Sequence, residues 1–354
     1  MKIGSVTLAS PFVVAPMAGM TDSAFRRLVK RQGGCGLVVT EMVSSEGLVR
    51  GIGRTLEYAE YTEEERPVSI QIFGGDPETM AEAAQIVEGM GADIVDINMG
   101  CPVQKIAKHH AGCSLMKTPE HAARVVGAMA RAVKIPVTVK MRAGWSDRQR
   151  NAPELARLVQ DAGAAAVTIH GRTAEQSYKG LADWELVARI ADDLTIPVLG
   201  SGDCIEPDQV LARTRDGVGG VLVGRGVLRN PWILSQASQL AAGERPRAVG
   251  QQERGQFLLD YIELLLRERT DEAQGFRHHA PGAITLDEGG AGVARGHDRW
   301  VINKLRALCA WYGSGMHGAA QLRVRVNAAQ RISELRHIID ETFMADRAVN
   351  ASLG

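Results

Sequence analysis

A cysteine able to act as an acid stands at position 101, in the run Asp96-Ile-Asn-Met-Gly-Cys-Pro102, directly after an apolar segment. An unperturbed thiol is mostly protonated at neutral pH, so Cys101 can give a proton to a substrate. A side chain just past a strand end is held by the scaffold and still faces the cleft. The alternative is a small buried hydrophobe, which is the usual fate of a free cysteine.

Polar side chains stand at the ends of other apolar runs. They include Gln71, Asn98, Lys140, Arg142 and His170, and the Gly-rich turns Gly200-Ser-Gly-Asp203 and Gly224-Arg-Gly226. A glutamine amide can donate and accept toward the pyrimidine edge of a flavin, and a lysine can stabilise negative charge there on reduction.

The two Gly-rich turns suit a phosphate, because their backbone N–H groups can approach an anion closely and Arg225 adds a fork-shaped donor. One phosphate site and one planar polar edge together fit FMN. Each residue also has a structural explanation. Lys140 could be a solvated strand-end charge, His170 a hydrogen-bonded core histidine, and the glycines a need of tight turns.

These residues are expected at the strand ends of a barrel. Short apolar runs recur, each followed by a helix-patterned segment, which is typical of a parallel sheet buried on both faces. The predicted strands are 12–15, 36–40, 68–72, 93–97, 137–141, 166–170, 198–200 and 220–223. Eight such units indicate an α/β TIM (β/α)8 barrel, whose active site lies at the C-terminal ends of the strands. A doubly wound sheet is the alternative, but no early G-x-G-x-x-G run is present.

Two helix starts carry a side-chain cap, a proline and an early acid: Asp76-Pro77-Glu78 and Thr118-Pro119-Glu120. From about residue 245 the pattern becomes that of amphipathic helices, over 256–266, 299–312 and 319–343. The Gly-rich segment 271–298 is predicted to be a mobile insertion. We therefore predict a catalytic domain over 1–243 and a helical domain over 244–354.

Composition excludes several classes of protein. The 354 residues have a formal net charge of zero, so any nucleic-acid site must be local. The five cysteines lack the spacing of a zinc or iron–sulfur site, and we expect a reduced, cytoplasmic protein without metal. No run approaches the roughly 20 apolar residues of a membrane span, so we expect no membrane association. We also expect a monomer.

These motifs resemble the tRNA-dihydrouridine synthases, most closely the bacterial B branch. The matching pieces are Pro16-Met-Ala-Gly-Met-Thr-Asp22, Glu41-Met42, Gln71, Asp96-Ile-Asn-Met-Gly-Cys-Pro102 with Gly112 and Leu115, Lys140-Met-Arg142, His170-Gly-Arg-Thr173, Gly202-Asp203 and Gly224-Arg225. The resemblance spans the whole barrel and continues more weakly into the helical tail. It implies a flavin enzyme that uses NADPH to reduce uridine in the D-loop of tRNA.

The resemblance also implies roles for individual residues. FMN would contact Pro16, Met17, Ala18, Gln71, Lys140 and His170, with its phosphate at Ser201, Gly202, Asp203, Gly224 and Arg225. Asn98, Lys140, Arg142 and His170 would surround the uracil, and we add Arg172 to the substrate-binding set. Hydride would go to C6 of the uracil and the proton on C5 would come from Cys101.

The chain departs from the family pattern at three places. Ser201 stands where asparagine is usual, so one flavin contact would be shorter or water-mediated. Cys113 replaces a small residue on the catalytic loop, where we expect it to pack rather than react. The segment 271–298 has the character of an insertion.

A basic stretch in the tail is the expected RNA contact. Between Arg295 and His337 there are eight Lys or Arg and two acids, a local net charge of +6. Arg299, Arg323 and Asn327 are the candidate contacts, with a solvated helix face as the alternative explanation. A target base inside a folded tRNA must also be extruded into the barrel.

Two other functions remain open at this point. One is an FMN barrel acting on a free pyrimidine, as a dihydroorotate dehydrogenase-like enzyme does, which needs no basic tail. The other is a flavin-containing tRNA-binding or tRNA-folding protein, in which loss of Cys101 would leave the biological effect intact.

Overall fold

The structure is a computed structural model that describes residues 1–103, 111–215, 217–267, 273–281 and 294–344. The chain divides into two compact units. The first, here called the barrel unit, comprises 1–227, 231–246 and 273–284. The second, the helical unit, comprises 228–230, 247–272 and 285–354.

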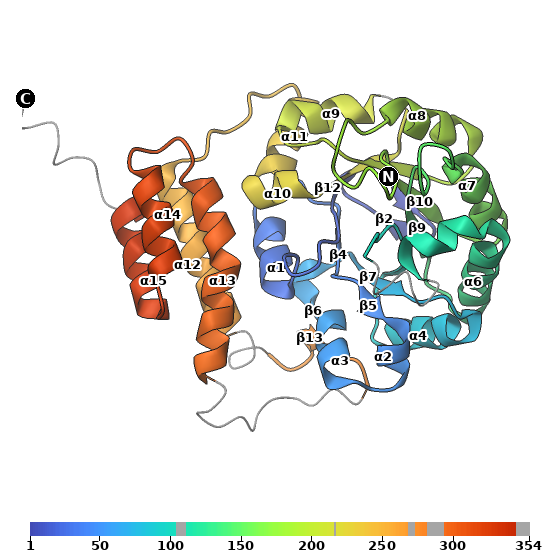
Figure 1. The fold of residues 1–354 in the computed structure, drawn as a ribbon, viewed down its shortest axis with the longest axis horizontal. Coiled ribbons are helices and arrows are strands. Elements are labelled where there is room, and N and C mark those ends of the chain that lie inside the picture. The colour runs from blue at the N-terminus through green and yellow to red at the C-terminus, as the bar shows by residue number, and fades with distance from the viewer. Residues whose placement is uncertain (104–110, 216, 268–272, 282–293, 345–354) are drawn as a thin grey trace, which may run out of the picture. The chain divides into compact units, whose positions relative to one another are not determined.

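The barrel unit is a closed ring of eight parallel strands (Figure 1). In chain order they are β3 (Phe12–Val14), β4 (Leu37–Val39), β7 (Val68–Phe73), β8 (Ile94–Met99), β9 (Val137–Arg142), β10 (Ala166–His170), β11 (Val198–Ser201) and β12 (Gly220–Val223). Pairing of β12 with β3 and of β4 with β7 completes the ring. The predicted TIM barrel is therefore confirmed, with every predicted strand in place.

Helices alternate with these strands and lie outside the ring (Figure 1). They are α1 (Ser23–Arg31), α2 (Ser45–Val49), α3 (Gly53–Ala59), α4 (Pro77–Gly89), α6 (Pro119–Ala132), α7 (Ala152–Asp161), α8 (Trp184–Asp193), α9 (Pro207–Thr214), α10 (Arg225–Arg229) and α11 (Ile233–Ala241). Two short 3-10 helices, η1 (Glu63–Glu65) and η2 (Gly112–Lys117), and the short strand β5 (Val43–Ser44) complete the connections.

Only one of the two predicted helix caps forms. The Asp76 carboxylate accepts a hydrogen bond from the Thr79 N–H at the start of α4, as predicted. Thr118 makes no side-chain cap at the start of α6, where its φ is −131° and its ψ is 75°. That conformation differs from the extended one usual at an N-cap, so the prediction for Thr118 was wrong.

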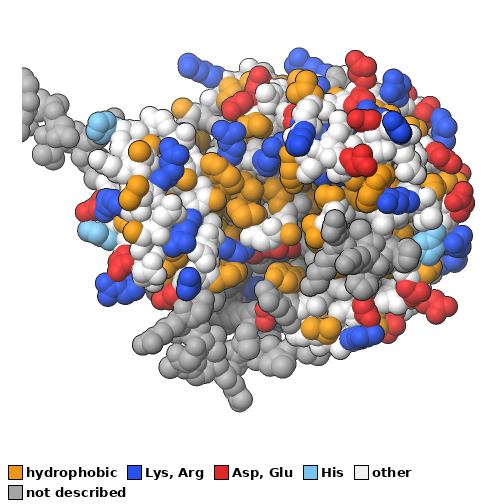
Figure 2. Space-filling model, viewed as in Figure 1, with side chains coloured by type: hydrophobic (Ala, Val, Ile, Leu, Met, Phe, Trp, Pro, Cys, Tyr) orange, Lys and Arg blue, Asp and Glu red, His pale blue; other side chains and the backbone are white. Residues whose placement is uncertain are grey.

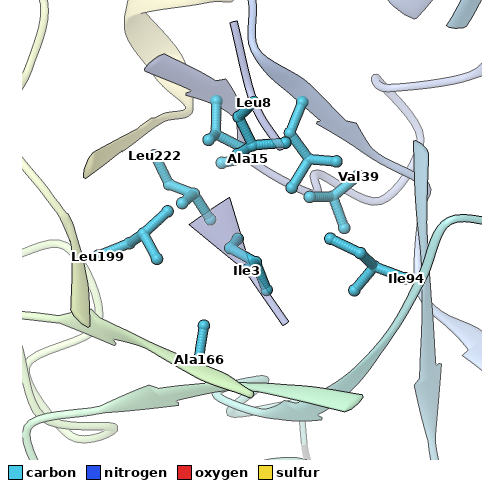
Figure 3. Packing of buried hydrophobic residues seen from close by; sticks show 10 residues of the cluster. Ile3, Leu8, Ala15, Val39, Ile94, Ala166, Leu199 and Leu222 are labelled. Atoms are coloured by element: carbon cyan, nitrogen blue, oxygen red, sulfur yellow. The ribbon is translucent and has the colours of Figure 1, made fainter. Parts of the chain in front are cut away.

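The N-terminal hairpin fills one end of the barrel. It consists of β1 (Lys2–Ile3) and β2 (Val6–Thr7), which pair antiparallel. Figure 3 shows the Ile3 side chain surrounded by side chains from the strands, and Ile3 is only 2% exposed. Its apolar neighbours include Leu8, Ala15, Val39, Ile94, Ala166, Leu199 and Leu222.

The helical unit has its own apolar core. Its elements are α12 (Gln251–Arg267), α13 (Ala294–Tyr312), α14 (Ala319–Ala328), α15 (Ile332–Ile339) and the π-helical turn η3 (Asp340–Met344). Buried side chains from each element meet, among them Tyr261, Leu305, Leu322, Leu335 and Phe343. The predicted helical tail is confirmed, and none of the described helices combines the length and apolarity needed to cross a bilayer.

Two tail predictions need correction. The segment 319–343 is not one helical stretch, because Ala329 is non-helical (φ −58°, ψ 132°) and a new helix starts at Ile332. The predicted mobile loop 271–298 contains β13 (Arg277–His278), which pairs with β6 (Tyr61–Thr62) in the barrel unit. Its last residues belong to α13, and 282–293 lie outside the described residues.

Candidate active site

A polar cavity opens at the C-terminal ends of the barrel strands, as the fold predicts. It encloses about 670 Å³ of space between atoms, including its open mouth. Ten of the residues predicted for the site line this cavity. They are Pro16, Met17, Lys140, Arg142, His170, Ser201, Gly202, Asp203, Gly224 and Arg225.

Five predicted site residues of the barrel do not line the cavity. Ala18 is exposed, and Cys101 is half-buried directly after the lining residue Gly100. Gln71, Asn98 and Arg172 are buried and hydrogen-bonded to other protein groups, and only the Arg172 Nη1 among their side-chain polar atoms has no partner in the described part of the chain.

One end of the cavity is built from backbone that only glycine fits. Gly202 has a φ of +126°, and a Cβ there would lie 2.6 Å from the Ala182 Cβ and 3.3 Å from the His170 ring. The next residue, Asp203, also has a positive φ of 53°. This turn and Gly224 leave the backbone open to the cavity beside the half-exposed Arg225. Such an arrangement suits an anion.

Arg172, a predicted substrate contact, holds this turn in the structure. Its Nη2 lies 2.6 and 2.9 Å from the two carboxylate oxygens of Asp203, and its Nε donates to the Lys179 carbonyl at 3.1 Å. Burial tends to raise the pKa of Asp203. Hydrogen bonds from the Ala182 N–H and from Arg172 outweigh that effect, so the pKa is lowered. Asp203 is therefore an anionic anchor for Arg172.

Lys140 and His170 also line the cavity, with the His170 ring next to the Gly202 turn. Burial, and to a lesser degree the neighbouring Arg142, lowers the pKa of Lys140 to about 8. Burial together with the positive charges of Lys140 and Arg142 lowers the pKa of His170 to about 2. The buried His170 Nε2 has no hydrogen-bond partner among the described residues. At neutral pH this part of the cavity therefore offers the Lys140 ammonium group and one neutral imidazole, beside Arg142.

Arg142, at the end of β9, connects the loops that follow β8 and β10. Its Nε donates to the Gly100 carbonyl at 2.9 Å, and its Nη1 donates to the carbonyls of Thr173 and Ser177 at 2.9 and 3.0 Å. Arg142 thereby orders the loop that carries Cys101 as well as lining the cavity.

A row of buried side chains leads from the barrel interior to Cys101. Gln71 Nε2 donates to Asp96 Oδ2 at 2.7 Å, and Asn98 Nδ2 donates to Gln71 Oε1 at 2.7 Å. Asn98 Oδ1 accepts the N–H groups of Gly100 at 3.1 Å and Cys101 at 2.9 Å. Burial raises the pKa of Asp96, against the effect of its hydrogen bonds from Thr138 and Gln71. We call Asp96, Gln71 and Asn98 the amide row.

The two thiols of the loop lie in different surroundings. Cys101 is half-buried, whereas Cys113 is fully buried and burial raises its pKa to about 12. The Cys113 N–H donates to the Cys101 carbonyl at 3.1 Å, which ties the two ends of the loop together. Cys101 is therefore the more accessible of the two.

Tyr178 is a lining residue that the sequence analysis missed. Its side chain is 62% exposed, and the Arg225 guanidinium lies 5.0 Å from its ring centroid. It stands five residues beyond the His170-Gly-Arg-Thr173 motif, in the loop after β10. An aromatic residue in a loop after a barrel strand would have been the signal.

The closed barrel and its polar cavity define an enzyme of the TIM-barrel class. Residues 13–288 match the family model described as dihydrouridine synthase. A probable tRNA-dihydrouridine synthase of Rickettsia conorii is 36% identical, over 92% of this chain and 91% of that protein. The tRNA-dihydrouridine synthase B of Xanthomonas campestris is 43% identical, over 69% of this chain and 74% of that protein. This chain belongs to the dihydrouridine synthase family, a family of oxidoreductases.

Proposed function

We propose that this protein reduces uridine to 5,6-dihydrouridine in the D-loop of tRNA, with FMN as cofactor and NADPH as reductant. The observation that carries the proposal is the cavity itself. It brings the Gly-rich turns at Gly202 and Gly224, which suit an anion, together with Lys140 and His170, and the half-buried Cys101 directly follows its lining residue Gly100. The names of the relatives point to the same substrate.

The residues present fit a flavin. A Cβ at Gly202, where φ is +126°, would lie 2.6 Å from the Ala182 Cβ, so the cradle there depends on glycine. The Lys140 ammonium group makes no hydrogen bond to a described residue, and the His170 Nε2 is also without a partner in the described part of the chain. We assign Ser201, Gly202, Asp203, Gly224 and Arg225 to the phosphate. Pro16, Met17, Ala18, Gln71, Lys140 and His170 are assigned to the rest of the cofactor.

When bound and reduced, the flavin supplies the hydride that C6 of the uracil receives. Negative charge then develops toward the C4 carbonyl, and donors nearby stabilise it. Lys140, Arg142 and neutral His170 are the donors at the cavity, with Asn98 behind them. Cys101 gives the proton that C5 takes up.

We expect Cys101→Ala to lose at least about 100-fold in the rate of dihydrouridine formation, because a general acid contributes that much or more. FMN binding and the reduction of FMN by NADPH should remain. Single-turnover reduction of tRNA, followed by mass spectrometry of the product, measures the rate.

Cys113→Ala is the matched control, because it removes a buried thiol from the same loop. That variant should retain turnover. The double variant tests whether Cys113 replaces Cys101 in the single one. Unchanged dihydrouridine formation by Cys101→Ala and by the double variant would rule Cys101 out as the acid.

We further propose that the helical domain, 244–354, binds the tRNA. Arg323 and Asn327 are exposed on α14, one turn apart, and Arg299 is exposed on α13. Figure 2 shows Lys and Arg side chains spread over the visible face of this unit. Such a surface contacts phosphates and leaves the choice of base to the cavity.

A further inference from the structure

The strand pairing places the amide row on one interior face of the barrel. Gln71 on β7 is in register with Asp96 on β8, and Asn98 follows two residues later on the same face of β8. All three side chains are at most 8% exposed. Water therefore has little part in satisfying their polar atoms.

Each amide in the row has only one productive orientation. The N–H groups of Gly100 and Cys101 can only donate, so they require the oxygen of Asn98 on their side. The Asn98 nitrogen then faces Gln71 and requires its oxygen, which turns the Gln71 nitrogen toward residue 96. The row is complete only if residue 96 presents an acceptor there.

We propose that Asp96 is a positioning residue for Cys101, acting through Gln71 and Asn98. By accepting the Gln71 amide, Asp96 fixes the direction of both amides and keeps the Asn98 oxygen on the Cys101 backbone. This inference rests on the proposed function, in which Cys101 is the acid.

The acceptor on Asp96, rather than its charge, is what the row requires. Its second oxygen accepts a hydrogen bond from the Thr138 hydroxyl at 2.6 Å. In Asp96→Asn the new amide oxygen can accept from Gln71, while its nitrogen donates to the Thr138 hydroxyl, which can also accept. Asp96→Leu has a similar volume and offers no acceptor, so the Gln71 nitrogen is left unpaired.

The test compares these variants as flavin-loaded proteins. Hydrogen exchange at the Gly100 and Cys101 amides should be about five- to tenfold faster in Asp96→Leu, and nearly unchanged in Asp96→Asn. Dihydrouridine formation should fall about 100-fold in Asp96→Leu, because a small misplacement of a catalytic group costs that much. The loss in Asp96→Asn should stay below about tenfold.

Thr138→Val is the matched control, because it removes a buried hydrogen bond from the other oxygen of the same carboxylate. It lowers stability without breaking the row, so exchange at Gly100 and Cys101 should stay as in the parent protein. If Asp96→Leu does not fold, Asp96→Ser replaces it, and the same results are expected. The serine hydroxyl is one bond closer to the backbone than the carboxylate oxygen, so it does not reach the Gln71 nitrogen.

Two results would overturn the proposal. One is unchanged exchange at Gly100 and Cys101 in both acceptor-deficient variants. The other is equal damage in Asp96→Asn and Asp96→Leu, which would assign the effect to charge. Failure of the proposed function would be recognised separately. An active Cys101→Ala variant would refute Cys101 as the acid, whereas the amide exchange rates of the Asp96 variants would be unaffected by that result.

Discussion

Lys140 and His170 line the same cavity but differ in charge at neutral pH. Burial disfavours the charged form of both. The pKa of Lys140, lowered to about 8, still leaves its ammonium group charged at pH 7, whereas that of His170, lowered to about 2, leaves a neutral ring. The cavity thus places the charged Lys140, together with Arg142 and Arg225, near a histidine that does not titrate between pH 5 and 8.

We expect dihydrouridine formation to decline as pH rises through about 8, because Lys140 then loses the charge that the reaction uses. A lysine with a lowered pKa is charged below that value and neutral above it. Single-turnover rates between about pH 6 and 9.5 give the profile.

Lys140→Arg provides the comparison, because a guanidinium stays charged over this range. Its rate will be lower through altered geometry, but its profile should lack the alkaline decline. A decline shared by both proteins would mean that a group other than Lys140 titrates.

For individual residues, the sequence predicted which side chains lie at the cavity better than it predicted their hydrogen-bond partners. Lys140, His170 and the Gly202 turn follow from their positions at strand ends, and all line the cavity. The orientation of Gln71 and Arg172 depends on partners 25 and 31 residues away, Asp96 and Asp203. No local pattern of residue types encodes those pairings.

Among the elements, the barrel strands were predictable because each is a short, mostly apolar and β-branched run with a helix-patterned segment after it. Strand β13 was not, because Arg277 and His278 are polar and pair with Tyr61 and Thr62 more than 200 residues earlier in the chain. The His278 ring stacks on Tyr61 with centroids 4.5 Å apart. A two-residue strand of this kind exists only through its tertiary contacts.

The helix break at Ala329 also went unpredicted, although a local signal was present. The run Asn327-Ala-Ala329 contains no helix breaker. The start of α15 is marked instead by Glu334, whose carboxylate accepts the Arg331 and Gln330 N–H groups. That acid at the third helical position was the available signal.

The N-terminal hairpin allows a stability prediction at this scale. Ile3→Ala should lower the free energy of unfolding of the barrel unit by about 2–5 kcal/mol, because it empties part of a close-packed layer. Val6→Ala on the same hairpin is the control and should cost less, since Val6 is only half-buried. Urea unfolding followed by tryptophan fluorescence compares them, and equal losses would contradict a special role for Ile3 in the barrel layer.

For the whole molecule, the expected affinity for tRNA depends on where the charges lie rather than on the net charge. The chain is neutral, yet the stretch from Arg295 to His337 carries a net +6. Arg323→Glu should weaken tRNA binding and lower the salt dependence of the affinity by about one unit or more of log–log slope. Binding titrations at several salt concentrations measure that slope.

Arg131→Glu, an exposed reversal on α6 of the barrel unit, is the matched control. It makes the same change in net charge and should leave the slope nearly unchanged. Equal effects of the two reversals would assign the salt dependence to overall charge rather than to α14.

The pairing of β13 with β6 also bears on the order in which the chain folds as it is made. The barrel unit includes 273–284, yet α12 of the helical unit precedes that segment. A ribosome therefore releases the first helix of the second unit before the last piece of the first. The barrel unit therefore cannot be completed before part of the helical unit has been made, although domains usually fold one at a time during synthesis. The barrel unit needs a segment that is translated only after the first helix of the helical unit.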